Sequence, residues 1–245
     1  MNRNKLRHYL LLATCALLAA GLTGCLYPKD RLAENQAPPR EAVRNVQAAI
    51  EQFKADRGML PIKNSSADTP VYEKFIIDFA KLQRMNYISA IPSAAYEKGG
   101  DYYFLLLNEE TDPIVRLMSV VVYQQLNDLQ AKVDAYAAAN GGALPLGEEA
   151  YPSFYYLAVD RLGIAKPDIR SVFGGQPLSV LVHENGTVFG DYGIDVRQAA
   201  LKSGSQPSGE QDLRELLMLQ TLFVPVKSPA YIWKDGDPFA LLPMN

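Results

Sequence analysis

Two segments of this chain repeat the same order of elements, and this repetition constrains the fold more than any other feature. Apolar residues recur at helical spacing in both segments, at Val43, Val46, Ile50 and Phe53 and again at Leu126, Leu129, Val133 and Tyr136. A glycine follows each predicted helix, Gly58 in the first and Gly141 in the second, as is common at helix ends. Leu60-Pro61 and Leu144-Pro145 come next, and proline cannot continue a helix.

The two segments also match in polar residues. Gln47 and Glu51 align with Gln130 and Asp134 when one residue is inserted. Chance similarity between amphipathic helices is the alternative. The order of the later elements argues against chance, because each copy continues with an aromatic-rich stretch, a glycine pair and an apolar run.

The later elements predict short helices and strands. Residues 72–82 and 154–162 are the aromatic-rich stretches, and both are expected to form short second helices. The apolar runs at 102–107 and 178–182 predict strands, preceded by Gly99-Gly100 and Gly174-Gly175. A hairpin with an Asn185-Gly186 turn joins the second run to residues 187–189, and a longer loop joins the first run to residues 114–117.

A third, partial copy closes the chain. Residues 203–210 have the composition of a flexible linker. Asp212 is the best N-cap candidate for a helix over residues 213–223. Residues 228–231 and 234–237 then echo residues 93–96 and 98–101, and a final strand is expected at 239–242. For this copy, chance similarity remains an alternative.

The predicted fold class is therefore α+β. We expect two tandem modules, residues 41–120 and 121–202, each with an amphipathic helix, a short helix and antiparallel strands. A linker at 203–210 leads to a C-terminal helix and strand, residues 211–245, that complete the sheet. Packing the modules together buries more apolar surface than either buries alone.

The N-terminus carries a targeting pattern. Arg3, Lys5 and Arg7 precede an apolar run over residues 10–22, which is too short to cross a bilayer. The run ends in Leu22, Thr23, Gly24 and Cys25. These four residues resemble the lipobox of bacterial lipoproteins, and an ordinary secretory signal is the alternative. The resemblance implies that residues 1–24 are removed as a signal peptide and that fatty acyl chains, such as palmitate, anchor Cys25.

The chain after the signal is acidic and has a single cysteine. Residues 25–40 are predicted to be the lipid anchor and a polar, proline-containing tether. Cys15 lies in the removed segment, so no disulfide is expected within the mature chain. Loss of the three basic signal residues takes the formal net charge from −3 to −6. This charge disfavours nucleic acid as a partner, and it disfavours electrostatic docking on an anionic membrane.

Two families resemble parts of the chain. Residues 25–36, 58–62 and 68–72, together with the glycine pairs, resemble the YphF-like lipoproteins of Gram-positive spore-forming bacteria. That resemblance implies a membrane-anchored, repeated fold and transfers no catalytic residue. The family has no established activity, although it has been labelled a transporter solute-binding component. The ends of the two long helices are similar to the spine helix of type II pseudopilins, but the lipobox stands where pseudopilins have a prepilin cleavage site.

Candidate catalytic and metal-binding residues are sparse. His183 is the single histidine of the mature chain and is expected in a solvated hairpin turn. A nucleophilic triad and a zinc site with His or Cys ligands are therefore poorly supported. Asp191, Asp195, Asp235 and Asp237 lie near glycines and suit calcium, but turn chemistry explains them equally well. We assign no catalytic residue and no metal ligand.

Aromatic residues are the candidates for ligand contact. Tyr155, Tyr156 and Trp233 are the ones we select, with core packing as the alternative reading of their clusters. We expect a non-enzymatic lipoprotein on the extracytoplasmic face of the cell membrane, with a binding or scaffolding role. We expect no cofactor other than the lipid on Cys25, and a protein or cell-wall partner. The alternatives are a transporter's solute-binding component and a cell-wall hydrolase that uses carboxylates.

Overall fold

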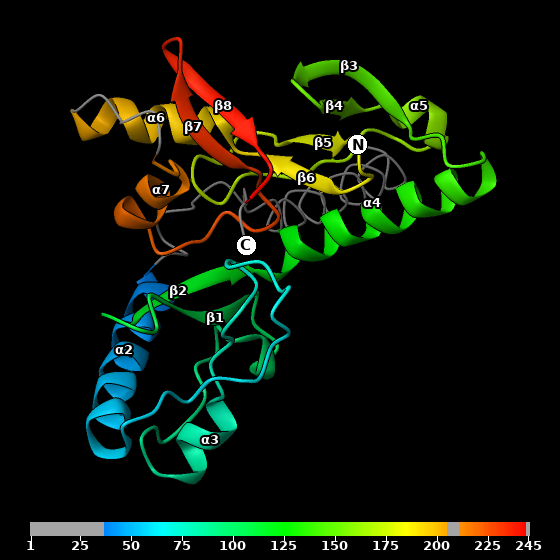
Figure 1. Ribbon diagram of the computed structural model, residues 1–245. Coiled ribbons are helices and arrows are strands. Elements are labelled where there is room, and N and C mark those ends of the chain that lie inside the picture. Colours follow the sequence, from blue (N-terminus) through cyan, green and yellow to red (C-terminus); the bar gives the residue numbers. More distant parts are fainter. Residues whose placement is uncertain (1–36, 205–210, 244–245) are drawn as a thin grey trace, which may run out of the picture. The chain divides into compact units, whose positions relative to one another are not determined.

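The computed structural model describes residues 37–204 and 211–243 (Figure 1). Helices and antiparallel sheets make up these residues, which confirms the predicted α+β class. Residues 39–245 cluster as one compact unit. The predicted lipobox with Cys25, the predicted tether up to residue 36 and residues 205–210 of the predicted linker lie outside the described residues.

The first module contains one long helix, short helical turns and one hairpin. Its elements are α2 (Ala37–Arg57), α3 (Phe79–Arg84), the 3-10 turn η2 (Tyr96–Lys98), β1 (Tyr102–Leu107) and β2 (Ile114–Ser119). The predicted strands are confirmed. Helix α2 begins at Ala37, within the expected tether of residues 25–40. Pro38 and Pro39 do not prevent this, because prolines are tolerated in the first turn of a helix.

The second module contains four strands, and the C-terminal part adds a hairpin. The second module comprises α4 (Val120–Ala139), β3 (Leu146–Tyr151), β4 (Phe154–Leu157), α5 (Val159–Leu162), β5 (Ser179–His183), β6 (Val188–Asp191) and α6 (Gly193–Ser203). The C-terminal elements are α7 (Arg214–Gln220), β7 (Ala230–Lys234) and β8 (Asp237–Leu241). Sequence analysis did not predict α6. No helix of the described residues has the length and apolarity needed to span a membrane.

The two modules share one strand order. β3, β4, β5 and β6 form an antiparallel sheet in that order. In the first module β1 and β2 pair, and isolated bridges extend the same arrangement, joining Ile62 to Ile77 and Ile76 to Leu105. The first module thus holds a shortened version of the four-stranded sheet.

Hydrogen bonds support the equivalence of Gln47 and Gln130. The Gln47 amide donates to the carbonyl of Pro113 at 2.9 Å and accepts from the N–H of Val115 at 2.8 Å. The Gln130 amide donates to the carbonyl of Gly186 at 2.9 Å and accepts from the N–H of Val188 at 2.7 Å. In each module, therefore, one glutamine joins the long helix to the second strand of the hairpin.

The predicted second helices are wrong over most of their length. Phe154–Leu157 forms strand β4, and the helix that follows is limited to Val159–Leu162. In the first copy, the helix begins only at Phe79, where the Asp78 carboxylate accepts the N–H of Lys81. The residues before each helix form backbone bridges to a neighbouring strand, and this tertiary pairing overrides local helical preference.

Strand β1 contributes to both hydrophobic cores. Phe104 and Leu106 pack with α2 in one core, while Leu105 and Leu107 pack with residues of the second module in the other. Successive strand residues point to opposite faces, so a continuous apolar run indicates burial on both faces. Figure 1 shows α2 beside the β1–β2 hairpin and α4 along β6.

The segment 222–228, which we call the staple, links β2 to β6. The N–H of Leu117 donates to the carbonyl of Leu222 at 2.8 Å, and Val224 donates back to Leu117 at 3.0 Å. Farther along, Gly190 in β6 donates to the carbonyl of Lys227 at 2.9 Å. The staple is thus bonded to the edge strands of both modules.

The C-terminal hairpin does not complete a module's sheet as expected. β7 and β8 pair only with each other, because the staple is bonded to β2 and β6. Residues 228–231 lead into strand β7. Residues 93–96, which resemble them in sequence, lead instead into a 3-10 turn, so the two similar segments differ in conformation.

Candidate functional site

A cavity of about 600 Å³ lies within the compact unit. Five parts of the chain line it: the loop 67–75, the β1–β2 hairpin end, the start of β6, the region from Asp212 to Ser228, and Pro243 after β8. Its volume is typical of pockets that bind small molecules. The cavity exists because the staple and α7 meet both modules.

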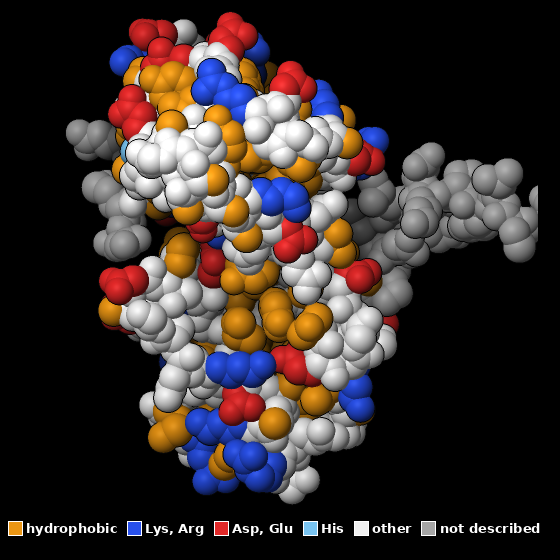
Figure 2. All heavy atoms as spheres, turned by 90° about the vertical axis from the view of Figure 1, so that its right-hand side faces the viewer, with side chains coloured by type: hydrophobic (Ala, Val, Ile, Leu, Met, Phe, Trp, Pro, Cys, Tyr) orange, Lys and Arg blue, Asp and Glu red, His pale blue; other side chains and the backbone are white. Residues whose placement is uncertain are grey.

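One wall of the cavity is apolar. Its side chains include Phe75, Leu107, Ile114, Phe189, Met218 and Pro225. Val71 and Leu219 also line the cavity and are 49% and 74% exposed, so the apolar surface continues to the solvent. Figure 2 shows hydrophobic side chains gathered in a recess at mid-height of one face, with charged side chains below them.

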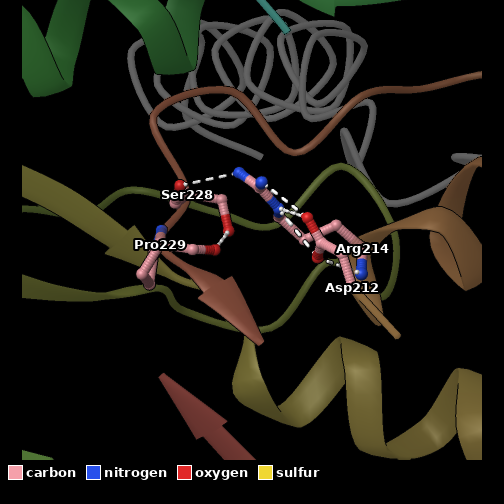
Figure 3. Close-up of polar contacts among 4 residues, drawn as sticks. All are labelled: Asp212, Arg214, Ser228 and Pro229. Atoms are coloured by element: carbon pink, nitrogen blue, oxygen red, sulfur yellow. Dashed lines mark hydrogen bonds and ion pairs between the residues drawn. The ribbon is translucent and has the colours of Figure 1, made fainter. Parts of the chain in front are cut away.

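The polar end of the cavity is organised around Arg214, which is buried. Its Nη2 donates to Asp212 Oδ2 at 2.6 Å, and its Nε donates to the same oxygen at 2.9 Å. Its Nη1 donates to the carbonyl of Ser228 at 3.2 Å (Figure 3). Asp212 also accepts the backbone N–H of Arg214, although Leu213 occupies the N-cap position of α7.

Tyr72 lies against the same arginine. The Arg214 guanidinium carbon is 4.8 Å from the centroid of the Tyr72 ring, a cation–π distance. Burial raises the pKa of the Tyr72 hydroxyl, so the phenol stays protonated at neutral pH. The arginine therefore has Asp212 as its ion partner and an aromatic ring on its face.

Glu73 is a half-buried carboxylate that lines the cavity. Burial raises its pKa above the ordinary glutamate value, and the ammonium and backbone N–H of Lys227 oppose the rise. No Lys, Arg or His nitrogen of residues 37–204 and 211–243 lies within 4.0 Å of the Glu73 carboxylate. The Lys227 ammonium lies 5.9 Å from the Tyr123 ring centroid.

The loop aspartates make structural contacts. Asp191 accepts from the Tyr231 hydroxyl at 2.8 Å, and Asp195 accepts from Gln176 at 2.6 Å and from Ser171 at 2.8 Å. Asp235 occupies the β7–β8 turn with φ of 52°. Within the described ranges, no group of three or more His, Cys, Asp or Glu side chains is placed to hold a metal.

His183 ends strand β5 at the hairpin. Its Nδ1 accepts the N–H of Asn185 at 3.1 Å, and its ring packs on Phe154 at 4.8 Å between centroids. The predicted Asn-Gly hairpin is confirmed, with Gly186 at φ of 89°.

The structure does not bring the selected aromatics together at the cavity. Tyr155 and Tyr156 lie side by side in sequence on β4, where the Tyr155 hydroxyl donates to Glu184 at 3.3 Å. Trp233 lies opposite Pro238 in the C-terminal hairpin and is partly buried. None of the three lines the cavity.

The charged residues of the cavity were missed for identifiable reasons. Arg214 follows Asp212 by two residues, and sequence analysis used that aspartate only as a helix cap. Tyr72 and Glu73 fell within a predicted helix. The proximity of Tyr72 to Arg214 depends on tertiary structure, and no local pattern signals it.

Comparison with known proteins identifies the first module. Residues 39–119 match the model of the YphF family N-terminal domain. This stretch is therefore similar to that domain. It covers α2, β1 and β2, and it confirms the resemblance found in the sequence. No curated protein and no solved structure matches the chain.

Proposed function

We propose that this chain is a lipid-anchored, extracytoplasmic binding protein whose cavity takes a small molecule. The cavity is the observation that carries the binding role. It combines an apolar wall with a few polar groups, as ligand sites commonly do. The lipobox pattern at Leu22 to Cys25 supports the location.

Binding is preferred to scaffolding because the cavity is already formed. Arg214, Asp212 and Ser228 hold one another through hydrogen bonds, so little ordering is needed when a ligand enters. The cavity is shared between two modules and a staple, and a ligand there touches all three.

The experiment blocks the mouth of the cavity with a matched control. Val71 lines the cavity and is 49% exposed, whereas Val121 is 50% exposed on α4 and does not line it. The full chain carrying Cys25→Ala is screened against a fragment library by ligand-observed NMR. We expect saturable binding that Val71→Trp abolishes and Val121→Trp preserves.

Two results would contradict the proposal. One is a screen in which no fragment binds saturably. The other is binding that survives Val71→Trp, because it would place the ligand elsewhere. Circular dichroism of both variants checks that the fold is retained.

A further inference from the structure

We propose that the cavity selects an amphipathic amine, a ligand with an apolar body and a protonated amino group. This inference rests on the proposed binding function and names the ligand class of the same site. It follows from which charged groups of the cavity already have partners.

The charge of Arg214 is already paired with Asp212, so this arginine adds little attraction for an anionic ligand. Its Nε and Nη2 are bonded to Asp212, and its Nη1 is bonded to the Ser228 carbonyl (Figure 3). Its face lies on the Tyr72 ring. A carboxylate or phosphate entering the cavity would meet an arginine whose charge Asp212 already balances, and the Asp212 carboxylate would repel it.

The two lysines of the cavity lie near aromatic rings. Lys74 Nζ is 5.1 Å from the Phe75 ring centroid, and Lys227 Nζ is 5.9 Å from that of Tyr123. These distances fall within the range of cation–π attraction, which satisfies part of each ammonium's need for a partner.

Three carboxylates of the cavity lack an ion pair. Glu73, Glu109 and Glu215 line it, and none has a cationic nitrogen within 4.0 Å among residues 37–204 and 211–243. Glu73 matters most because it is half-buried in the cavity, and the Lys227 ammonium that attracts it lies beyond the 4.0 Å of an ion pair. A buried charge is stabilised by a partner of opposite sign.

The apolar wall determines the other half of the ligand. Phe75, Leu107 and Met218 offer a surface for a hydrocarbon chain or ring. Burying such a body supplies hydrophobic affinity, and the amino group then pairs with Glu73. An experiment can therefore measure separately the affinity that the apolar wall gives to the hydrocarbon body and the selectivity that Glu73 gives to the amino group.

The test uses probes that share one hydrocarbon chain. Octylamine, octanol and octanoate are titrated by calorimetry into the full chain carrying Cys25→Ala, below their micelle concentrations. We expect octylamine to bind about tenfold more tightly than octanol, the gain of a charge-assisted hydrogen bond, and octanoate to bind most weakly. Glu73→Gln should remove the amine preference and leave octanol unchanged. Glu41→Gln, an exposed change on α2 outside the cavity, should change neither.

The outcomes separate this inference from the proposed function. Saturable binding of octanol with no preference for octylamine overturns the amine inference and leaves the cavity as a binding site. Absence of saturable binding by all three probes overturns the amine inference, and the fragment screen then decides the proposed function separately. If the Glu73→Gln variant still prefers octylamine to octanol, Glu73 is not the group that pairs with the amine. If that variant does not fold, the order of the three probes on the chain with native Glu73 decides.

Discussion

At the scale of single residues, Gln47 and Gln130 each join a helix to a hairpin with one side chain. In each hairpin, the amide bonds to a backbone carbonyl and to a backbone N–H two residues farther along. Each amide also donates to an acidic side chain one turn later on its own helix, Glu51 for Gln47 and Asp134 for Gln130. The side chain thus satisfies backbone groups that would otherwise be unpaired beside the core.

We predict that Gln47→Ala and Gln130→Ala each destabilise the fold by about 1–3 kcal/mol. The reason is that each leaves a partly buried backbone N–H without its partner. Urea unfolding measures the change. The exposed residues Gln52 and Gln124 lie on the same two helices and serve as alanine controls, with expected changes below about 0.5 kcal/mol. Losses equal to those of the controls would contradict the role assigned to the two glutamines.

Asp195 is a second residue whose environment has a measurable consequence. Burial raises the pKa of its carboxyl, while hydrogen bonds from Ser171 and Gln176 oppose the rise. The folded state therefore holds this proton more tightly than the unfolded state does. Its contribution to stability is largest at pH below the unfolded pKa and is lost as pH rises through the folded pKa.

We predict that Asp195→Asn removes this part of the pH dependence. The free energy of unfolding of the native protein, relative to the variant, should rise as pH is lowered from about 7 to about 4. The asparagine side-chain oxygen can still accept from Gln176, and its NH₂ group can donate to the Ser171 hydroxyl. The variant should therefore fold. Urea unfolding across this range tests the prediction, and a difference independent of pH would contradict it.

At the scale of elements, the sequence predicted strands better than second helices. Residues 102–107 and 178–182 were recognised because an apolar run follows a glycine pair. Residues 154–157 were mistaken for a helix, since a short aromatic run is ambiguous without its partners. The hydrogen bonds of β4 to β3 and β5 decide its conformation, and they join residues distant in sequence.

The staple is the element on which the cavity depends, and its hydrogen bonds can be removed individually. Val224→Pro deletes the N–H that donates to Leu117, so we expect a loss of about 1–3 kcal/mol in stability. Hydrogen exchange should become faster at the amides of Leu117 and Gly190, both of which donate to the staple. Val224→Ala keeps the N–H and should accelerate these amides less. Equal exchange in the two variants would show that the bond is unimportant.

At the scale of the whole molecule, repetition was predictable and the cavity was not. Matching Gln47 with Gln130 needs only the sequence, because the repeat preserves its helix. The cavity needs Glu73, Leu107, Phe189 and Arg214 together, and they come from four distant segments. No spacing rule relates such residues. The clustering of aromatic residues in the sequence points instead to Tyr155, Tyr156 and Trp233, which do not line the cavity.

Anchoring is the remaining property of the whole molecule. The chain after the predicted cleavage site carries a net charge of −6, which opposes electrostatic attachment to an anionic bilayer. Two or three acyl chains, as predicted for Cys25, would hold a protein firmly, whereas a single chain binds only marginally. Attachment should therefore depend on this one residue.

We predict that Cys25→Ala moves the protein from the membrane to the soluble fraction outside the cytoplasm, while its circular dichroism stays unchanged. Cys15→Ala is the matched control, since Cys15 lies in the segment expected to be removed, and this variant should remain membrane-bound. Fractionation and immunoblotting of both variants measure the outcome. If the protein stays on the membrane without Cys25, something other than a lipid on this residue holds it there, and the predicted anchor is wrong.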